Sequence, residues 1–202
     1  MNEPHDIPSI STWAQSVQAA VTAIRQAGGQ NYLLIPGSSW SSAQALPTEA
    51  GPALLNVTDP LGGTSRLIFD VHKYLDSGNS GTHPDCTTNN LQVFQTLVSW
   101  LQANGRQAIL SETGGGNTQS CITMYVFFSI LSFDISIWML TLFEKSRLGQ
   151  QLSFIQSSYP TLLGFTIWAA GAFDTTYVLT VTPNADGSDQ PLWAQAVKPY
   201  LP

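Results

Sequence analysis

Four short apolar runs, separated by longer stretches, are the feature that most constrains the fold of this chain. They lie at residues 32–35, 67–71, 107–110 and 162–167, and each has the length of a buried strand. Two of the other stretches carry apolar residues at helical spacing, one from Trp13, after a candidate N-cap at Thr12, and one from Leu91. A short last helix is expected over residues 190–200. Buried strands that alternate with amphipathic helices predict an α/β fold with a parallel, helix-covered sheet.

The spacing of these strands singles out one unusual segment. The strand starts near residues 32, 67, 107 and 162 are 35, 40 and 55 residues apart, and the excess of the last interval lies in residues 124–143, MYVFFSILSFDISIWMLTLF. Such a segment is long enough to be a transmembrane helix, but a charge at mid-span, Asp134, is costly in a membrane. A buried helix is the second interpretation, and a translated intron is the third. We favour the third because Met124-Tyr125-Val126 can be encoded by codons that contain GTATGT, a common intron start.

The composition excludes some classes of partner. Only 10% of the residues are charged, seven of them are Lys or Arg, and the net charge is −6, so a nucleic-acid interface built from clustered cations is not expected. Neutral polar residues together with six Trp and six Tyr suit the binding of neutral sugars. The first residues lack the basic start and apolar run of a signal peptide. No group of His, Asp, Glu or Cys has a metal-ligand spacing, so we expect no metal and no cofactor.

Two glutamates stand in distinctive settings 109 positions apart. Glu3 precedes Pro4, and Glu112 follows an apolar run and precedes three glycines, Gly114–Gly116. A carboxyl that follows a strand and opens into a turn is well placed for chemistry, and two such groups can flank a glycosidic bond. The strand that would carry Glu3 does not precede it in this sequence.

Six short motifs, in order, make the chain resemble the fungal endoglucanases of glycoside hydrolase family five. The resemblance runs from Asn2 to about Cys121 and resumes from about Gln151 to Pro183. Its motifs are Asn2-Glu3-Pro4, Leu34-Ile35-Pro36-Gly37, Ile68-Phe69-Asp70-Val71-His72-Lys73-Tyr74-Leu75-Asp76, Cys86-Thr87-Thr88-Asn89-Asn90, Leu110-Ser111-Glu112-Thr113-Gly114-Gly115-Gly116-Asn117 and Gly164-Phe165-Thr166-Ile167-Trp168.

The resemblance implies a partial (β/α)₈ barrel that runs from the end of strand four through strand eight. Residues 1–202 then form one partial catalytic domain, in which 124–149 is an insertion foreign to the family. The implied activity is that of a retaining endo-β-1,4-glucanase on cellulose or β-glucan, with a β-mannanase or a β-1,3-glucanase as near alternatives. It also implies a secreted monomer with no membrane partner.

A hypothesis of another class stays open beside this one. Half a barrel leaves strand edges unpaired, so the chain is alternatively a catalytically incompetent fragment or a non-catalytic glucan-binding protein. A membrane-anchored form is the third alternative.

The resemblance also assigns roles to residues of the catalytic centre. It implies that Glu3 is the general acid/base and Glu112 the nucleophile. Asn2 is expected to bond the sugar 2-hydroxyl. His72 and Tyr74 are expected to line the site, with the hydroxyl of Tyr74 orienting Glu112.

Further residues are assigned in the same way. Trp168 is expected to be the platform under the sugar at the point of cleavage, and Cys86 and Cys121 to form a disulfide. Trp40, which follows Pro36-Gly37, is expected either to line an outer subsite or merely to pack.

Overall fold

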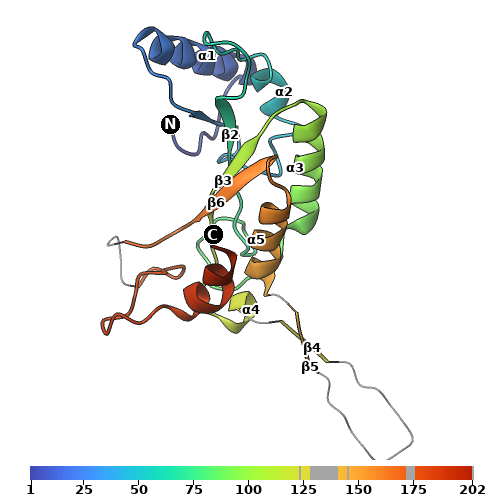
Figure 1. Cartoon of the computed structure of the whole chain (residues 1–202), viewed down its shortest axis with the longest axis vertical. Coiled ribbons are helices and arrows are strands. Elements are labelled where there is room, and N and C mark those ends of the chain that lie inside the picture. Colours follow the sequence, from blue (N-terminus) through green and yellow to red (C-terminus); the bar gives the residue numbers. More distant parts are fainter. Residues whose placement is uncertain (123, 128–140, 145, 172–175, 202) are drawn as a thin grey trace, which may run out of the picture. The chain divides into compact units, whose positions relative to one another are not determined.

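The computed structural model describes residues 1–122, 124–127, 141–144, 146–171 and 176–201 of the chain (Figure 1). In chain order its elements are α1 (Ile10–Gln26), β1 (Leu33–Pro36), α2 (Gly51–Leu54), β2 (Leu67–His72), α3 (Leu91–Ala103), β3 (Ala108–Thr113), α4 (Gln119–Ile122), β4 (Met124–Phe127), β5 (Thr141–Glu144), α5 (Arg147–Ser157), β6 (Leu162–Ile167), η1 (Trp193–Val197) and η2 (Lys198–Tyr200).

Four of the strands form one parallel sheet in the order β1-β2-β3-β6. These are the four strands that the sequence predicted, and each begins within one residue of its predicted start. β3 runs three residues beyond its predicted end, so Glu112 lies within the strand. The predicted α/β class with a parallel sheet is therefore confirmed.

β2 is buried along its whole length, and its two faces have different neighbours. Leu67, Phe69 and Val71 belong to the apolar core. That core also contains Val21 of α1 and Leu97 of α3, so both predicted helices contribute to it. Because side chains alternate along a strand, Asp70 and His72 lie on the opposite face of β2. A single strand thus supplies apolar residues to the core and polar ones to the other side of the sheet.

Two predictions about helices need correction. The first helix begins at Ile10 with Ser9 as its N-cap, whose hydroxyl accepts a hydrogen bond from the Thr12 backbone N–H at 3.3 Å. Thr12 therefore lies in the first turn, and the prediction that it caps the helix is wrong. The short helix predicted over residues 190–200 is present as the π turn η1 and the 3₁₀ turn η2.

The described ends of the apolar segment are extended strands. β4 and β5 pair in antiparallel fashion with Met124 opposite Glu144, so a continuous helix over residues 124–143, buried or membrane-spanning, is contradicted at both ends. Residues 128–140 lie outside the described part of the chain. Within that part, no helix combines the length and the apolar character needed to cross a membrane. α5 begins at Arg147, inside the range predicted as an insertion.

The chain divides into two compact units. Unit 1 comprises residues 1–74, 90–113 and 153–168, and unit 2 comprises residues 75–89, 114–152 and 169–202. Unit 1 contains the parallel sheet with α1, α2 and α3. Unit 2 contains the predicted disulfide between Cys86 and Cys121, which is present. A Cβ on Gly115 would lie 2.7 Å and 2.8 Å from the two sulfur atoms, so the loop after β3 packs on the disulfide only with glycine at this position.

We expect replacement of both cysteines by alanine to lower the free energy of unfolding by about 4 kcal/mol, because the cross-link closes a loop of 35 residues and restricts the unfolded chain. Urea denaturation of the oxidised protein and of the C86A/C121A variant measures the difference. Reductant is the control, since it should bring the parent chain to the midpoint of the variant and leave the variant unmoved. Equal midpoints under oxidising conditions would contradict the prediction.

A buried ion pair fastens α1 to the segment that precedes β2. Arg25 donates from Nε to Asp59 Oδ1 at 3.0 Å and from Nη2 to Oδ2 at 2.8 Å, and both side chains are buried. These hydrogen bonds from Arg25 hold the pKa of Asp59 below its ordinary value, although burial acts in the opposite direction. Asp59 therefore contributes stability above the carboxyl pKa of the unfolded chain, and that stability is lost as the pH falls through its lower pKa in the folded chain.

Loss of one partner of this pair should destabilise the fold more than loss of both. R25M leaves Asp59 buried and unpaired, whereas R25M/D59L replaces the pair with apolar side chains, so we expect the thermal midpoint of the double variant to lie between those of R25M and the parent chain or above both. Acidification should lower the thermal midpoint of the parent chain relative to that of the double variant, because only the parent loses the contribution of Asp59. A double variant less stable than R25M would count against this account.

Candidate active site

A row of backbone hydrogen bonds joins the segments that follow the strands of unit 1. The N–H of Trp40 donates to Pro4 O at 3.1 Å, and the N–H of His72 donates to Ser41 O at 2.8 Å. One strand further, Lys73 N donates to Glu112 O at 3.0 Å, and beside β6 Trp168 N donates to Thr113 O at 2.8 Å. These hydrogen bonds hold the N-terminal segment beside the carboxyl ends of the four strands.

This row brings the two predicted carboxyls together around His72. His72 Nδ1 lies 2.8 Å from Glu3 Oε1 and 3.6 Å from Glu112 Oε2. The nearest ligand atoms of the three side chains all lie within 4.8 Å of one another. His72 is buried, while Glu3 and Glu112 are only partly exposed. Residues 109 positions apart in the sequence thus form one cluster.

Both oxygens of Glu112 receive hydrogen bonds. Tyr74 donates from its hydroxyl to Oε2 at 2.9 Å, and Asn2 donates from Nδ2 to Oε1 at 3.2 Å. Donors on both oxygens fix the plane of the carboxyl group. The predicted contact between Tyr74 and Glu112 is present in the structure.

The N-terminal segment reaches the cluster through an unusual backbone conformation. Glu3 has a φ of 44°, in the left-handed region that costs a residue with a side chain about 1–3 kcal/mol. The neighbouring Pro4 is buried and accepts the hydrogen bond from Trp40. The surrounding contacts therefore hold Glu3 in a conformation that the free peptide would rarely adopt.

Two tryptophans lie at the same edge of the sheet. Trp168 follows β6 directly, next to the end of β3, and its indole is half-buried. Trp40 is 54% exposed and stacks on the ring of His5, with centroids 4.8 Å apart and an angle of 12° between the planes. Trp40 is therefore not a core residue, and the choice between lining an outer subsite and merely packing stays a prediction.

Two polar residues at the site, Asp70 and Ser111, were not assigned any role from the sequence. Asp70 is buried and accepts a hydrogen bond from the hydroxyl of Ser111, and its Oδ2 lies 3.8 Å from His72 Nε2. The signal that could have found Asp70 is its spacing of two from His72, which places both side chains on one face of a strand.

Glu3, His72 and Glu112 are also the group that could hold a divalent cation among the residues the structure describes. Two carboxylates and an imidazole suit manganese, iron or zinc. Hydrogen bonds already join His72 to Glu3 and cap both oxygens of Glu112. An ion bound by Glu3 and His72 would have to replace the hydrogen bond between these two side chains.

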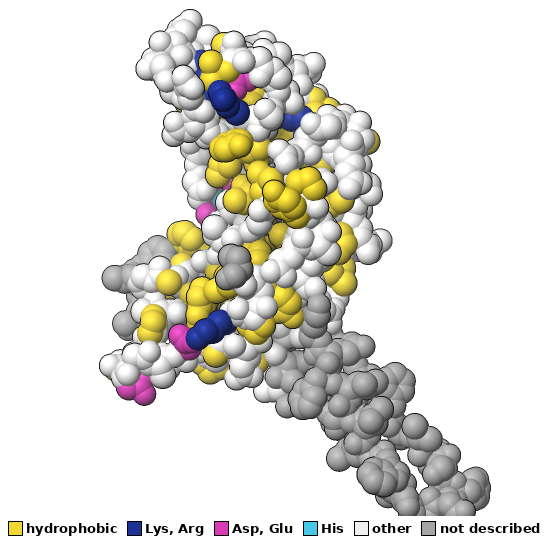
Figure 2. Space-filling view, in the orientation of Figure 1, with side chains coloured by type: hydrophobic (Ala, Val, Ile, Leu, Met, Phe, Trp, Pro, Cys, Tyr) yellow, Lys and Arg dark blue, Asp and Glu magenta, His cyan; other side chains and the backbone are white. Residues whose placement is uncertain are grey.

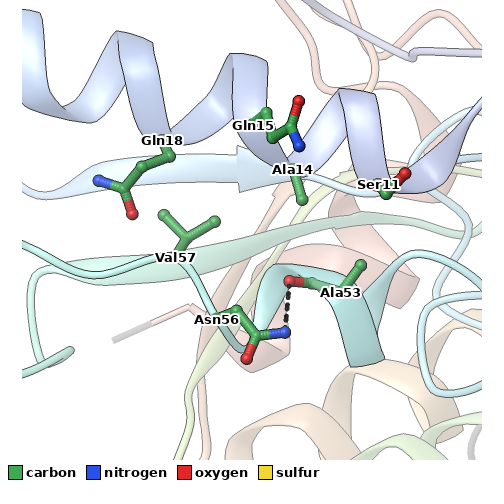
Figure 3. Close-up of a pocket in the computed structure, with 7 residues that line it drawn as sticks. All are labelled: Ser11, Ala14, Gln15, Gln18, Ala53, Asn56 and Val57. Atoms are coloured by element: carbon green, nitrogen blue, oxygen red, sulfur yellow. Dashed lines mark hydrogen bonds between the residues drawn. The ribbon is translucent and has the colours of Figure 1, made fainter.

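A surface hollow of unit 1 lies elsewhere. Its volume is about 290 Å³. Figure 3 shows the residues of α1 and of the segment around α2 that line it: Ser11, Ala14, Gln15, Gln18, Ala53, Asn56 and Val57. None of the predicted site residues lines it. The face drawn in Figure 2 carries few charged side chains among hydrophobic and neutral polar ones, in keeping with the composition.

Comparison with known proteins places the chain among cellulases. The family described as cellulase (glycosyl hydrolase family 5) matches residues 1–143. The manganese-dependent endoglucanase of Phanerodontia chrysosporium is 70% identical over 203 residues, which cover 100% of this chain and 47% of that protein. Endoglucanase EG-II of Hypocrea jecorina is 47% identical over 191 residues, covering 93% of this chain and 40% of that protein. The chain thus spans about half the length of the curated relatives it matches.

Solved structures agree with this placement. Cel5A (EG2) from Hypocrea jecorina superposes with a TM-score of 0.82 at 45% identity, covering 98% of this chain and 54% of that one. A structure titled XacCel5A in complex with cellopentaose gives 0.80 at 32% identity, covering 100% and 58%. The parallel sheet is therefore part of a (β/α)₈ barrel, as the sequence resemblance implied.

Proposed function

The chain belongs to glycosyl hydrolase family 5, and from that premise we propose that it carries the two catalytic carboxyls of a retaining endo-β-1,4-glucanase acting on cellulose or β-glucan. The observation that carries the proposal is the approach of Glu3 and Glu112, whose nearest oxygens lie within 4.8 Å. Retaining glycosidases place their carboxyls about 5–5.5 Å apart, whereas inverting enzymes need about 6.5–9.5 Å to admit a water. The spacing here suits the retaining class.

In the first step, Glu112 is the nucleophile. Its carboxylate attacks the anomeric carbon while Glu3 gives its proton to the departing glycosidic oxygen, so the bond breaks and a glycosyl-enzyme ester forms. The hydrogen bonds from Tyr74 and Asn2 fix the orientation of the Glu112 carboxylate. The amide of Asn2, which lies beside the nucleophile, is the group that we expect to meet the sugar 2-hydroxyl.

In the second step, Glu3 acts as the base. Its carboxylate takes a proton from a water molecule, whose oxygen attacks the anomeric carbon and expels Glu112. Two inversions give net retention of the β configuration. Glu3 is 32% exposed at its side chain, which gives the attacking water access to it.

The aromatic residues at this edge of the sheet would bind the glucan. Trp168 follows β6, beside the end of β3, and we assign it the sugar platform at the point of cleavage. Trp40 offers an exposed indole whose plane His5 supports, and we assign it an outer subsite. Flat aromatic faces suit neutral pyranose rings, and the substrate would be a polysaccharide, not a nucleic acid or a membrane.

The second candidate is a glucan-binding protein without turnover. It is motivated by the sheet, in which β1 and β6 each have one paired neighbour among the described strands.

The disulfide favours an oxidising compartment, and we propose that the protein is secreted and monomeric. Gel filtration of the culture supernatant of an expressing host would test both points.

We expect the chain to release reducing ends from carboxymethyl cellulose faster than from β-mannan or β-1,3-glucan, and the first product from a cello-oligosaccharide to be the β-anomer by NMR. The assay should use the 202-residue chain and the same chain fused behind the N-terminal half of the Phanerodontia chrysosporium relative. Preference for mannan would reject the glucanase assignment, and binding to cellulose without hydrolysis in both forms would favour the binder.

Isosteric amides separate the two carboxyls. E112Q should abolish hydrolysis, because no nucleophile is left. E3Q should slow hydrolysis of cello-oligosaccharides by about 10²–10⁴-fold, the range that acid–base catalysis contributes. The matched control is Glu49→Gln, which removes a carboxylate that binds Ser38 and Ser39 instead of the cluster. Equal losses in E49Q and E3Q would point to a general fold defect.

Trp40 should affect binding more than chemistry. W40A is expected to raise KM for cellopentaose several-fold and to leave kcat for shorter substrates nearly unchanged, because an outer subsite contributes uniform binding. Tyr32→Ala is the control, since Tyr32 is 68% exposed and precedes β1 at the opposite end of the strand. An unchanged KM for cellopentaose in W40A would remove Trp40 from the binding surface.

A further inference from the structure

We propose that Asn56 is a site of N-linked glycosylation and that the first N-acetylglucosamine of the glycan lies in the hollow between α1 and the segment around α2. Asn56-Val57-Thr58 is the only Asn-X-Ser/Thr triplet in the 202 residues, and its middle residue is not proline. The inference rests on the proposed secretion, because such glycans are attached in the secretory pathway.

The acceptor residue is accessible. Asn56 is exposed and lies in the turn that follows α2, and Thr58, the hydroxyl residue of the triplet, is exposed too. Asn56 Nδ2 donates long hydrogen bonds, of 3.4 Å to Pro52 O and 3.3 Å to Ala53 O. An amide nitrogen linked to a sugar keeps one hydrogen, so it can keep one of these two bonds. Glycosylation is therefore compatible with the local hydrogen bonds of the turn.

The hollow beside Asn56 has the chemistry of a seat for a neutral sugar. None of the seven residues that line it is charged. Ala14, Ala53 and Val57 give it methyl groups, and Gln15 adds an exposed amide (Figure 3). Methyl groups suit the acetyl group of the sugar, and an amide can hydrogen-bond its hydroxyls. Because Asn56 itself lines the hollow, a sugar on its nitrogen is held there at high effective concentration.

The hollow lies on the helix-covered side of the sheet. Val57 belongs to the apolar core shared with α1 and α3, whereas Asp70 and His72 lie on the opposite face of β2. Gln18 of α1 holds the two walls of the hollow together, since its Oε1 accepts from Thr58 N at 2.8 Å and its Nε2 donates to Thr58 O at 3.0 Å. A glycan at Asn56 would thus cover apolar groups of the helix layer and not the carboxyl cluster.

The attachment is a substitution at the anomeric carbon of the sugar. The amide nitrogen of Asn56 forms a bond to C1 of N-acetylglucosamine, and the bond from C1 to the diphosphate of a lipid carrier breaks. The lipid diphosphate leaves with the electron pair of that bond, and the amide nitrogen gives up one proton. The lipid-linked oligosaccharide and the transferring enzyme belong to the cell that makes the chain.

Occupancy of Asn56 can be measured without any hydrolysis of cellulose. The 202-residue chain is translated behind a supplied signal peptide in the presence of rough microsomes. We expect it to gain the mass of a glycan, and peptide-N-glycosidase, which converts glycosylated asparagine to aspartate, to change the mass of the peptide that contains Asn56. N56Q and T58A should lose the modification and T58S should retain it.

The matched control is N31Q, which changes another exposed asparagine outside a sequon and should leave the glycan in place. An unmodified Asn56 in chains whose signal peptide has been cleaved overturns the proposal. A chain that is glycosylated but does not hydrolyse cellulose would count against the glucanase assignment alone, so the two failures are distinguishable.

The position of the sugar is tested on the secreted 202-residue chain, or on its fusion behind the N-terminal half of the Phanerodontia chrysosporium relative, after trimming of the glycan to one N-acetylglucosamine. We expect nuclear Overhauser contacts between the acetyl methyl group and the methyl groups of Ala14 and Ala53. The thermal midpoint should lie about 2–4 °C above that of N56Q, the shift for about 1 kcal/mol in a chain of this size.

Two alanine variants isolate the hollow. A53Q fills it with a longer side chain and should abolish both the contacts and the rise in the thermal midpoint. A19Q adds the same side chain at an exposed position of α1 that does not line the hollow, and should keep both. A glycosylated Asn56 without these contacts, or an equal rise in A53Q, overturns the placement of the sugar in the hollow.

Discussion

The alignment of the four parallel strands at their carboxyl ends is the constraint on which the rest of this structure depends. At these ends, single backbone hydrogen bonds join neighbouring segments. Trp40 donates to Pro4, His72 donates to Ser41, and Lys73 donates to Glu112. Every residue of the cluster is next to one of these bonds or takes part in it. A slip of one residue in β2 would send His72 to the other side of the sheet, because side chains alternate along a strand.

The same alignment explains how polar groups can be buried here. Asp70, His72 and Thr113 are all buried, and each has a partner: Asp70 has Ser111, His72 has Glu3, and Thr113 donates to Lys73 O at 2.6 Å. Burying such groups unpaired would cost a large part of the stability of a domain. The carboxyl ends of the strands are therefore held by a connected set of hydrogen bonds, while one face of the sheet packs on α1 and α3 in an apolar core.

The two carboxyl groups of the cluster, Glu3 and Glu112, differ in how the surrounding structure holds them. Glu112 belongs to a central strand and has donors on both oxygens, whereas Glu3 lies outside the described strands and has a left-handed backbone conformation. Backbone strain of this kind persists only where neighbouring contacts outweigh it. The contacts with His72 and Trp40 supply that support.

Much of this could be predicted from the sequence, because it depends on neighbours along the chain. The alternation of apolar runs and amphipathic stretches determined the strands, the two long helices and the α/β class. The ordered motifs determined the family, the carboxyl pair and the cysteine pair. Local patterns predicted the ends of elements less accurately. Ser9, and not Thr12, caps α1, because the turn of the chain decides which hydroxyl reaches the free backbone N–H. The nature of residues 124–149 as an insertion remains a prediction.

Only the tertiary structure decided which of these residues meet. The sequence placed Asp70 in a motif but gave it no partner. The contacts of Asp70 with Ser111 and His72, and of His72 with Glu3, join strands and segments that are 41 and 69 positions apart. The register of the parallel sheet brings residues so far apart in the sequence into contact, and no local sequence pattern encodes that register. The sequence thus determined the chemical groups and the strands that carry them, and the packing of those strands decided the distances at which the groups act.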